Sequence, residues 1–178
     1  LYVKKGVINR MKESNNKIIN SDLNSLSSWT SSNFIMKQIQ QDLPKGLAKL
    51  NNQILAFGNE TVEAFYNAGN PSGSPLSVIK QLQQRIGLVA VTTNIVSNSG
   101  ATHYYAIVSN KLFFVGRRAG GFASIGLFAY NGSIYEKVST PAVDKILGER
   151  NESIFSVSSF GFNGQSAVAI SLVSPSTS

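Results

Sequence analysis

The stretch IGLFAYNGSIYEKV (residues 125–138) carries the clearest structural pattern in the sequence. Residues with high β propensity fill Ile125–Tyr130 and Ser133–Val138, and Asn131-Gly132 lies between them. An Asn-Gly pair between two such runs is typical of a two-residue type I′ β-hairpin. The stretch therefore predicts a pair of antiparallel strands joined by a tight turn.

Other short runs with strand-like alternation surround this hairpin on both sides. They are bounded by Gly, Asn, Ser and Pro, which favour turns for separate steric and hydrogen-bonding reasons. The further predicted strands are 54–57, 62–66, 88–96, 102–108, 112–115, 153–160 and 167–173, with short helices at 75–86 and 141–147. Residues after 174 are expected to form a disordered tail. Residues 44–178 are thus predicted to form an antiparallel β-meander with one or two short helices.

The first 43 residues carry a different pattern. Between Gly6 and Pro44 the sequence has no Gly or Pro, and apolar residues recur mostly at steps of three, four and seven. This spacing predicts a long amphipathic helix over residues 7–43, about 55 Å long at 1.5 Å per residue. A break near Asn15-Asn16 or at Ser31-Ser32 is the alternative, because Ser and Asn are poor helix formers.

The predicted fold class is α+β, with the long N-terminal helix packed on the meander. The predicted organisation is a projecting helix at residues 1–43, whose second half packs on the sheet, and a globular part at residues 44–178. An antiparallel meander needs one face covered, and this half of the helix is the available cover. The residues expected in the helix–sheet core are Leu26, Trp29, Met36, Ile39 and Leu43.

Composition narrows the class of protein. The chain has 178 residues, 14% of them charged, against 25 Ser and 17 Asn by count, so hydroxyls and amides form much of its polar surface. This favours a protein that lies outside the cytosol or is covered by neighbours. The net charge is +7, of which residues 1–50 carry +5. There is no cysteine, which excludes disulfide scaffolds, Cys-ligated zinc and cysteine nucleophiles.

A search for catalytic groups finds no convincing set, so we expect a protein that is not an enzyme and has no cofactor and no metal site. His103 is the only histidine, and it lies in a strand-like pattern without a carboxylate cluster nearby. Arg117 and Arg118 follow a strand and precede a Gly-rich segment. They are a candidate contact for an anion or DNA, although a hairpin connection with two solvated arginines is the simpler interpretation.

The order of a long one-sided helix followed by a meander resembles the type IV pilin-like family, in particular minor pilins and J-type minor pseudopilins. Three stretches carry the resemblance: FIMKQIQQDL at 34–43, HYYAIV with KLFFVGRR at 103–118, and IFSVSSF with AVAISL at 154–172. They are similar, in turn, to the end of the family's long helix, to its central strand pair and to its closing strand pair.

The resemblance implies a structural subunit of an extracellular type IV pilus-like or type II secretion filament, with a role in adhesion or protein secretion. It implies other pilin or pseudopilin subunits as partners, and DNA or a host surface as further possible partners. It also implies membrane attachment through a segment before Leu1, with residence in the inner membrane before assembly. The filament-packing helix residues it implies are Val7, Ile8, Met11, Ile18, Ile19 and Leu23.

The alternative interpretation is a soluble extracellular or virion-surface binding or adhesion module that oligomerises through its N-terminal helix. The two interpretations differ in what precedes Leu1, because a pilin requires a leader followed by an apolar anchor.

Overall fold

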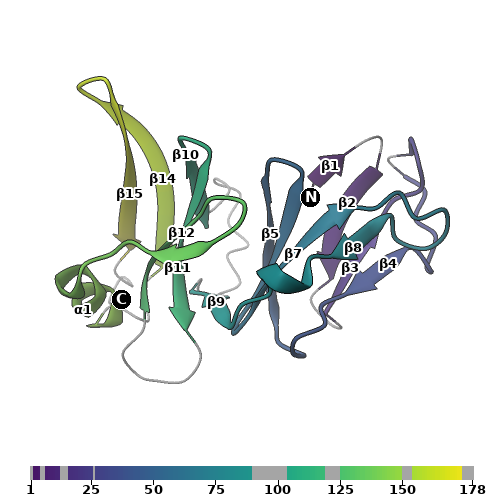
Figure 1. The fold of residues 1–178 in the computed structure, drawn as a ribbon, viewed down its shortest axis with the longest axis horizontal. Helices are drawn as coiled ribbons and strands as arrows, with labels where there is room; N and C mark the ends of the chain where they lie inside the picture. Colours follow the sequence, from purple (N-terminus) through teal and green to yellow (C-terminus); the bar gives the residue numbers. More distant parts are fainter. Residues whose placement is uncertain are drawn as a thin grey trace, which may run out of the picture. The chain divides into compact units, whose positions relative to one another are not determined.

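The computed structural model describes residues 2–4, 7–12, 16–25, 27–89, 104–118, 125–149 and 154–173. Almost all regular structure in these ranges is β-strand, as Figure 1 shows, with α1 (Pro141–Glu149) as their one α-helix. Residue contacts divide the chain into unit 1, Leu1–Arg85, and unit 2, Ile86–Ser178. Each unit has its own sheets and its own hydrophobic cluster.

Unit 1 contains two four-stranded antiparallel sheets in which each strand pairs with the next one along the chain. The strands of the first sheet are β1 (Tyr2–Lys4), β2 (Val7–Lys12), β3 (Lys17–Asn20) and β4 (Phe34–Met36). Those of the second sheet are β5 (Pro44–Leu50), β6 (Gln53–Gly58), β7 (Val62–Asn67) and β8 (Leu76–Val78), followed by the 3-10 turn η1 (Lys80–Leu82).

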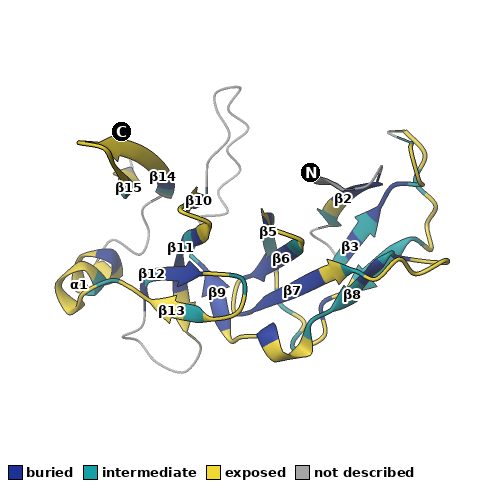
Figure 2. Ribbon diagram, turned by 45° about the horizontal axis from the view of Figure 1, so that its top comes forward, coloured by how far each residue is buried: buried dark blue, intermediate teal, exposed yellow. Residues whose placement is uncertain are grey.

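The core of unit 1 lies between these two sheets. Ile18 of β3 packs with Ile54, Ala56 and Phe65 of the second sheet, and all four side chains are at most 1% exposed. Figure 2 shows that β6 and β7 are buried along most of their length. Burial of one such aliphatic or aromatic side chain contributes about 1.5–3 kcal/mol, so this contact between the sheets stabilises unit 1 substantially.

The predicted N-terminal helix is wrong, since the described residues between 2 and 36 form the strands β1 to β4 and segments that connect them. The apolar steps of three, four and seven arise from short strands separated by turns, which place buried residues at intervals that imitate a helix. Asn16 and Asn24 adopt left-handed backbone angles, with φ of 58° and 57°. Asn tolerates this conformation better than most residues and serves in turns. The fold is therefore nearly all β, and not α+β.

The residues assigned to the two halves of that helix lie on strands and loops instead. Val7, Ile8 and Ile18 are buried, Met11 and Ile19 are partly buried, and Leu23 is exposed. In the second set Trp29 and Ile39 are partly buried, Met36 and Leu43 are exposed, and Leu26 lies outside the described residues.

Unit 2 is built on an antiparallel sheet in the order β10 (Tyr105–Val108), β11 (Lys111–Arg118), β12 (Ile125–Tyr130) and β13 (Tyr135–Lys137). The short strand β9 (Ile86–Leu88) also pairs with β11, and α1 packs on β12. A separate hairpin, β14 (Ile154–Phe162) with β15 (Gln165–Val173), packs on β10.

The core of unit 2 lies between the β10–β13 sheet and one face of the β14–β15 hairpin. Ala106, Val115 and Val157 are buried there with Ile125 and Leu147, and Val168 and Ile170 pack against them. The hairpin strands predicted for 125–138 are confirmed. The predicted two-residue turn is wrong, because Tyr130 pairs with Tyr135 across a loop of four residues, where Asn131 Oδ1 accepts hydrogen bonds from the amides of Ser133 and Ile134.

The predicted short helix at 75–86 is also wrong, since that segment forms β8, η1 and the start of β9. The predicted helix after Thr140 is confirmed as α1. Strands predicted at 153–160 and 167–173 are confirmed as β14 and β15, each slightly longer than expected.

Candidate functional site

A buried charged cluster joins the β4–β5 connection to the β6–β7 turn in unit 1. Lys37 Nζ lies 2.5 Å from Asp42 Oδ1, and their side chains are 0% and 3% exposed. Lys37 Nζ also donates to Thr61 Oγ1 at 2.7 Å. Asp42 Oδ2 accepts from the amides of Glu60 at 2.8 Å and Thr61 at 2.9 Å. Burial lowers the pKa of Lys37, and the hydrogen bond and charge of Asp42 oppose that shift.

Glu63 extends this cluster from the start of β7. Its side chain is fully buried, and its carboxylate accepts from the amides of Gln38 at 2.8 Å and Ile39 at 3.2 Å. Gln83 Nε2 donates to the same carboxylate at 2.8 Å. A buried carboxylate is tolerated where hydrogen bonds satisfy its oxygens. The cluster of Lys37, Asp42, Thr61 and Glu63, here called the unit 1 charged cluster, therefore fixes the β4–β5 connection onto the second sheet.

The donors and acceptors of the unit 1 charged cluster are directed at one another, and their side chains are removed from solvent. A general acid or base must reach a substrate proton at hydrogen-bond distance. This cluster therefore has the geometry of a structural clamp.

Two further carboxylates organise loops. Asp22 Oδ1 accepts from Asn33 Nδ2 at 2.8 Å, and Asp22 also accepts from the Ser28 hydroxyl, whose hydrogen bond lowers the pKa of Asp22. In unit 2, Asp144 Oδ2 lies 2.5 Å from Lys137 Nζ, and Asp144 accepts from Ser139 Oγ. Burial acts to raise the pKa of Asp144, but these bonds outweigh it and the pKa is lowered.

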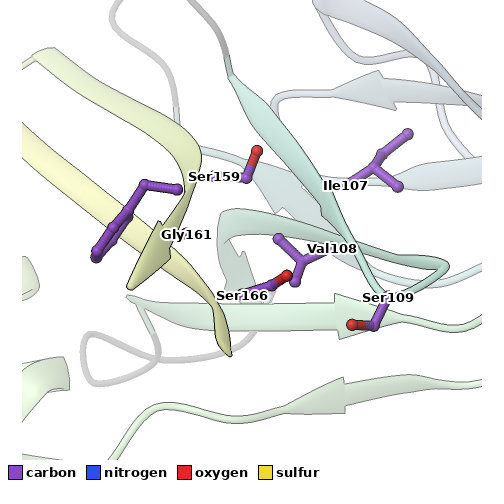
Figure 3. A pocket seen from close by; sticks show the side chains of 7 residues that line it. Ile107, Val108, Ser109, Ser159, Gly161 and Ser166 are labelled. Atoms are coloured by element: carbon purple, nitrogen blue, oxygen red, sulfur yellow. The ribbon is translucent and has the colours of Figure 1, made fainter. Parts of the chain in front are cut away.

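A shallow, open pocket of about 310 Å³ lies in unit 2 between the β10–β11 turn and the distal end of the β14–β15 hairpin (Figure 3). Three serine hydroxyls and apolar side chains line it, and none of the lining residues is charged. The lining residues are Ile107, Val108, Ser109, Ser159, Phe160, Gly161 and Ser166. The lining of this pocket combines apolar side chains with hydroxyl groups, which are the features of a contact surface.

The residues predicted for an anion or DNA contact, Arg117 and Arg118, are exposed at the end of β11. The Arg118 guanidinium carbon lies 5.9 Å from the ring centroid of Phe128. Their binding role stays a prediction. His103 lies outside the described residues. Within the described ranges no group of three or more His, Asp or Glu side chains could hold a metal ion.

Sequence reasoning missed the unit 1 charged cluster. One pattern in the sequence points to it, because Glu63 lies inside the apolar run Val62–Tyr66. A carboxylate that is buried in such a run must have its oxygens hydrogen-bonded within the protein. Lys37 and Asp42 carry no such pattern, because the helical spacing predicts both as polar positions of a helix.

The fold now defines the class of protein. In unit 1, consecutive strands form two four-stranded antiparallel sheets, which pack face to face around a shared core. This is how the blades of a β-propeller are built and stacked. A family model described as "Bacteriophage P22 Gp10, beta-propeller" matches residues 4–174, and the chain belongs to that family. A search of curated proteins gives no match.

Family membership corrects the resemblance to type IV pilins. The matching family is a bacteriophage family, so a pilus or secretion-filament subunit with pilin partners is wrong. Membrane attachment loses its basis with the pilin assignment, and the described residues contain no helix with the length and apolarity to cross a bilayer. The pilin resemblance rested on a helix that does not exist and on strand patterns common to many antiparallel sheets. The predicted extracellular location agrees with the family only in part, since a virion-associated protein lies outside the cell and a pilus is not involved.

Proposed function

We propose that this chain is a non-enzymatic structural subunit of a phage virion, which stabilises the capsid or tail by binding neighbouring virion proteins. The family match over residues 4–174 carries this proposal. Of the two interpretations of the sequence, the virion-surface binding module agrees with it, although oligomerisation through an N-terminal helix does not.

The described side chains support a binding role over a catalytic one. The carboxylates of unit 1 are engaged in hydrogen bonds that fix loops, and the unit 2 pocket is lined by hydroxyls and apolar groups. A chain in which only 14% of the residues are charged suits contact with other proteins, because charged residues are depleted at interface cores.

Location in the particle tests this proposal. Virions of the phage that encodes this chain would be purified through a density gradient and labelled with an antibody raised against residues 1–178. We expect stoichiometric labelling of intact particles at the capsid or tail, and particles made without the protein are expected to release DNA at lower temperature than native ones. Finding the chain in infected cells but not on purified particles would refute a structural role.

A further inference from the structure

The β14–β15 hairpin differs from every other sheet in the described part of the chain. It has two strands where the sheets of unit 1 have four, and no described strand pairs with the second edge of β15. β14 packs more closely on β10 than β15 does and also contacts β11, so β15 forms the outlying edge (Figure 1). Figure 2 shows that much of the hairpin is exposed.

This edge lacks the features that normally prevent strands from pairing. From Ser153 to Ser178 the sequence contains no Asp, Glu, Lys or Arg, and β15 contains no proline. Its nine residues pair with β14 without a register shift. Natural edge strands usually carry a lysine, a proline or a bulge, or are very short. A regular nine-residue edge without any of them is suited to accept another strand.

The sequence of β15, QSAVAISLV, is also complementary to itself. Antiparallel pairing of two copies about Ala169 aligns all nine residues and places Val168 opposite Ile170 twice. Val168 and Ile170 lie on the face that packs against the unit 2 core, and β-branched pairs on one face stabilise antiparallel sheets. No charge opposes a like charge in this register, although the whole chain carries +7.

We infer that β15 pairs with β15 of a second copy of this chain, around a two-fold axis at Ala169. The resulting sheet has the order β14, β15, β15 and β14, with four strands as in the sheets of unit 1. A two-fold interface of this kind is isologous, so one patch serves both partners. The inference concerns the purified chain alone and does not depend on the proposed role in the virion.

Charge reversal at the axis tests this inference with residues 1–178. Ala169 is partly buried on the outer face of the hairpin, opposite Ser158 of its own chain. Ala169→Lys and Ala169→Glu each place two like charges directly opposite each other in the dimer. By sedimentation velocity, we expect the native chain to dimerise, each variant alone to dissociate about tenfold more readily or more, and an equimolar mixture of the two variants to regain the dimer.

Ser158→Lys is the matched control, because it adds a charge to the same face of the hairpin on β14, away from the β15 edge. It is expected to leave the dimer intact, and far-UV circular dichroism checks that every variant is folded. A native chain that stays monomeric at high concentration overturns the inference. A mixture that fails to recover the dimer from folded variants also overturns it.

Discussion

Lys37 Nζ and Asp42 Oδ1 lie 2.5 Å apart in unit 1, with both side chains almost completely removed from solvent. The Asp42 carboxylate also accepts hydrogen bonds from two backbone amides and from the hydroxyl of Thr61. A buried ion pair is a weak net stabiliser compared with apolar groups, but removal of one partner leaves a charge without compensation.

Asp42→Ala is therefore expected to destabilise unit 1 by about 3–5 kcal/mol. Lys37→Met should cost less, because Asp42 keeps its three remaining donors. Urea unfolding followed by far-UV circular dichroism measures both units, and the fluorescence of Trp29, the single tryptophan, measures unit 1. Lys145→Gln is the control: its pair with Glu149 is exposed and 3.9 Å long, so the change should stay below about 1 kcal/mol. Equal losses for Asp42→Ala and Lys145→Gln would show that the buried cluster has no structural weight.

Glu63→Gln tests the second carboxylate of the unit 1 charged cluster. Both carboxylate oxygens accept from the Gln38 amide, and one accepts from Gln83. A glutamine side chain keeps one acceptor oxygen, turns the other into a donor and removes the negative charge, so the hydrogen bonds from the amides of Gln38 and Ile39 lose their charge assistance. This loss should cost about 1–3 kcal/mol.

Hydrogen exchange checks this prediction locally, because the amides of Gln38 and Ile39 should exchange faster in Glu63→Gln than in the native chain. Glu136→Gln on the exposed side of β13 makes the same chemical change without buried donors, and it should leave those amides unchanged. Unchanged protection in Glu63→Gln would contradict the role assigned to its carboxylate.

The strands of unit 2 could be predicted from the sequence because short runs rich in β-branched and aromatic residues lie between recognisable turns, as in Ile125–Tyr130. The strands of the N-terminal sheet could not be predicted from the sequence. Strands of three to six residues are too short to display their period, and the turns at Asn16 and Asn24 lack the Gly or Pro that would mark them. Three-, four- and seven-residue steps then satisfied a helix template equally well.

The charged cluster was beyond sequence reasoning for a different reason. Lys37, Asp42 and Thr61 meet only because the β4–β5 connection folds across the β6–β7 turn. A pairing of residues 19 to 24 positions apart depends on topology, and a helix over residues 7–43 does not produce this topology. The family match likewise rests on the whole chain, whereas each short motif used for the pilin resemblance was individually weak.

The pH dependence of unit 2 should reflect Asp144. Its pKa in the folded protein lies below the ordinary value of 3.8, so as the pH falls the unfolded chain takes up a proton first. The stability that Asp144 contributes is therefore complete above about pH 4 and is lost as the pH falls through the lower folded pKa. Asp144→Asn should differ from the native chain in urea midpoint at pH 7, and the difference should shrink at about pH 2–3. A difference that persists undiminished at low pH would contradict the assignment.

Gly116 of β11 is predicted to tolerate no side chain. A Cβ atom there would lie 2.9 Å from Ile86 Cγ2 and 2.9 Å from a ring carbon of both Phe114 and Phe128. The two rings stack with centroids 5.8 Å apart and are fully buried, so neither can move away freely. Overpacking of this kind costs about 1–3 kcal/mol. Gly116→Ala should therefore lower the stability of unit 2 in thermal unfolding followed by far-UV circular dichroism.

Gly161→Ala in β14 is the matched control, since a Cβ there meets no atom within 4 Å. It should be neutral or slightly stabilising, because alanine restricts the unfolded chain; similar losses for both variants would show that strand propensity, and not the aromatic contact, decides the effect.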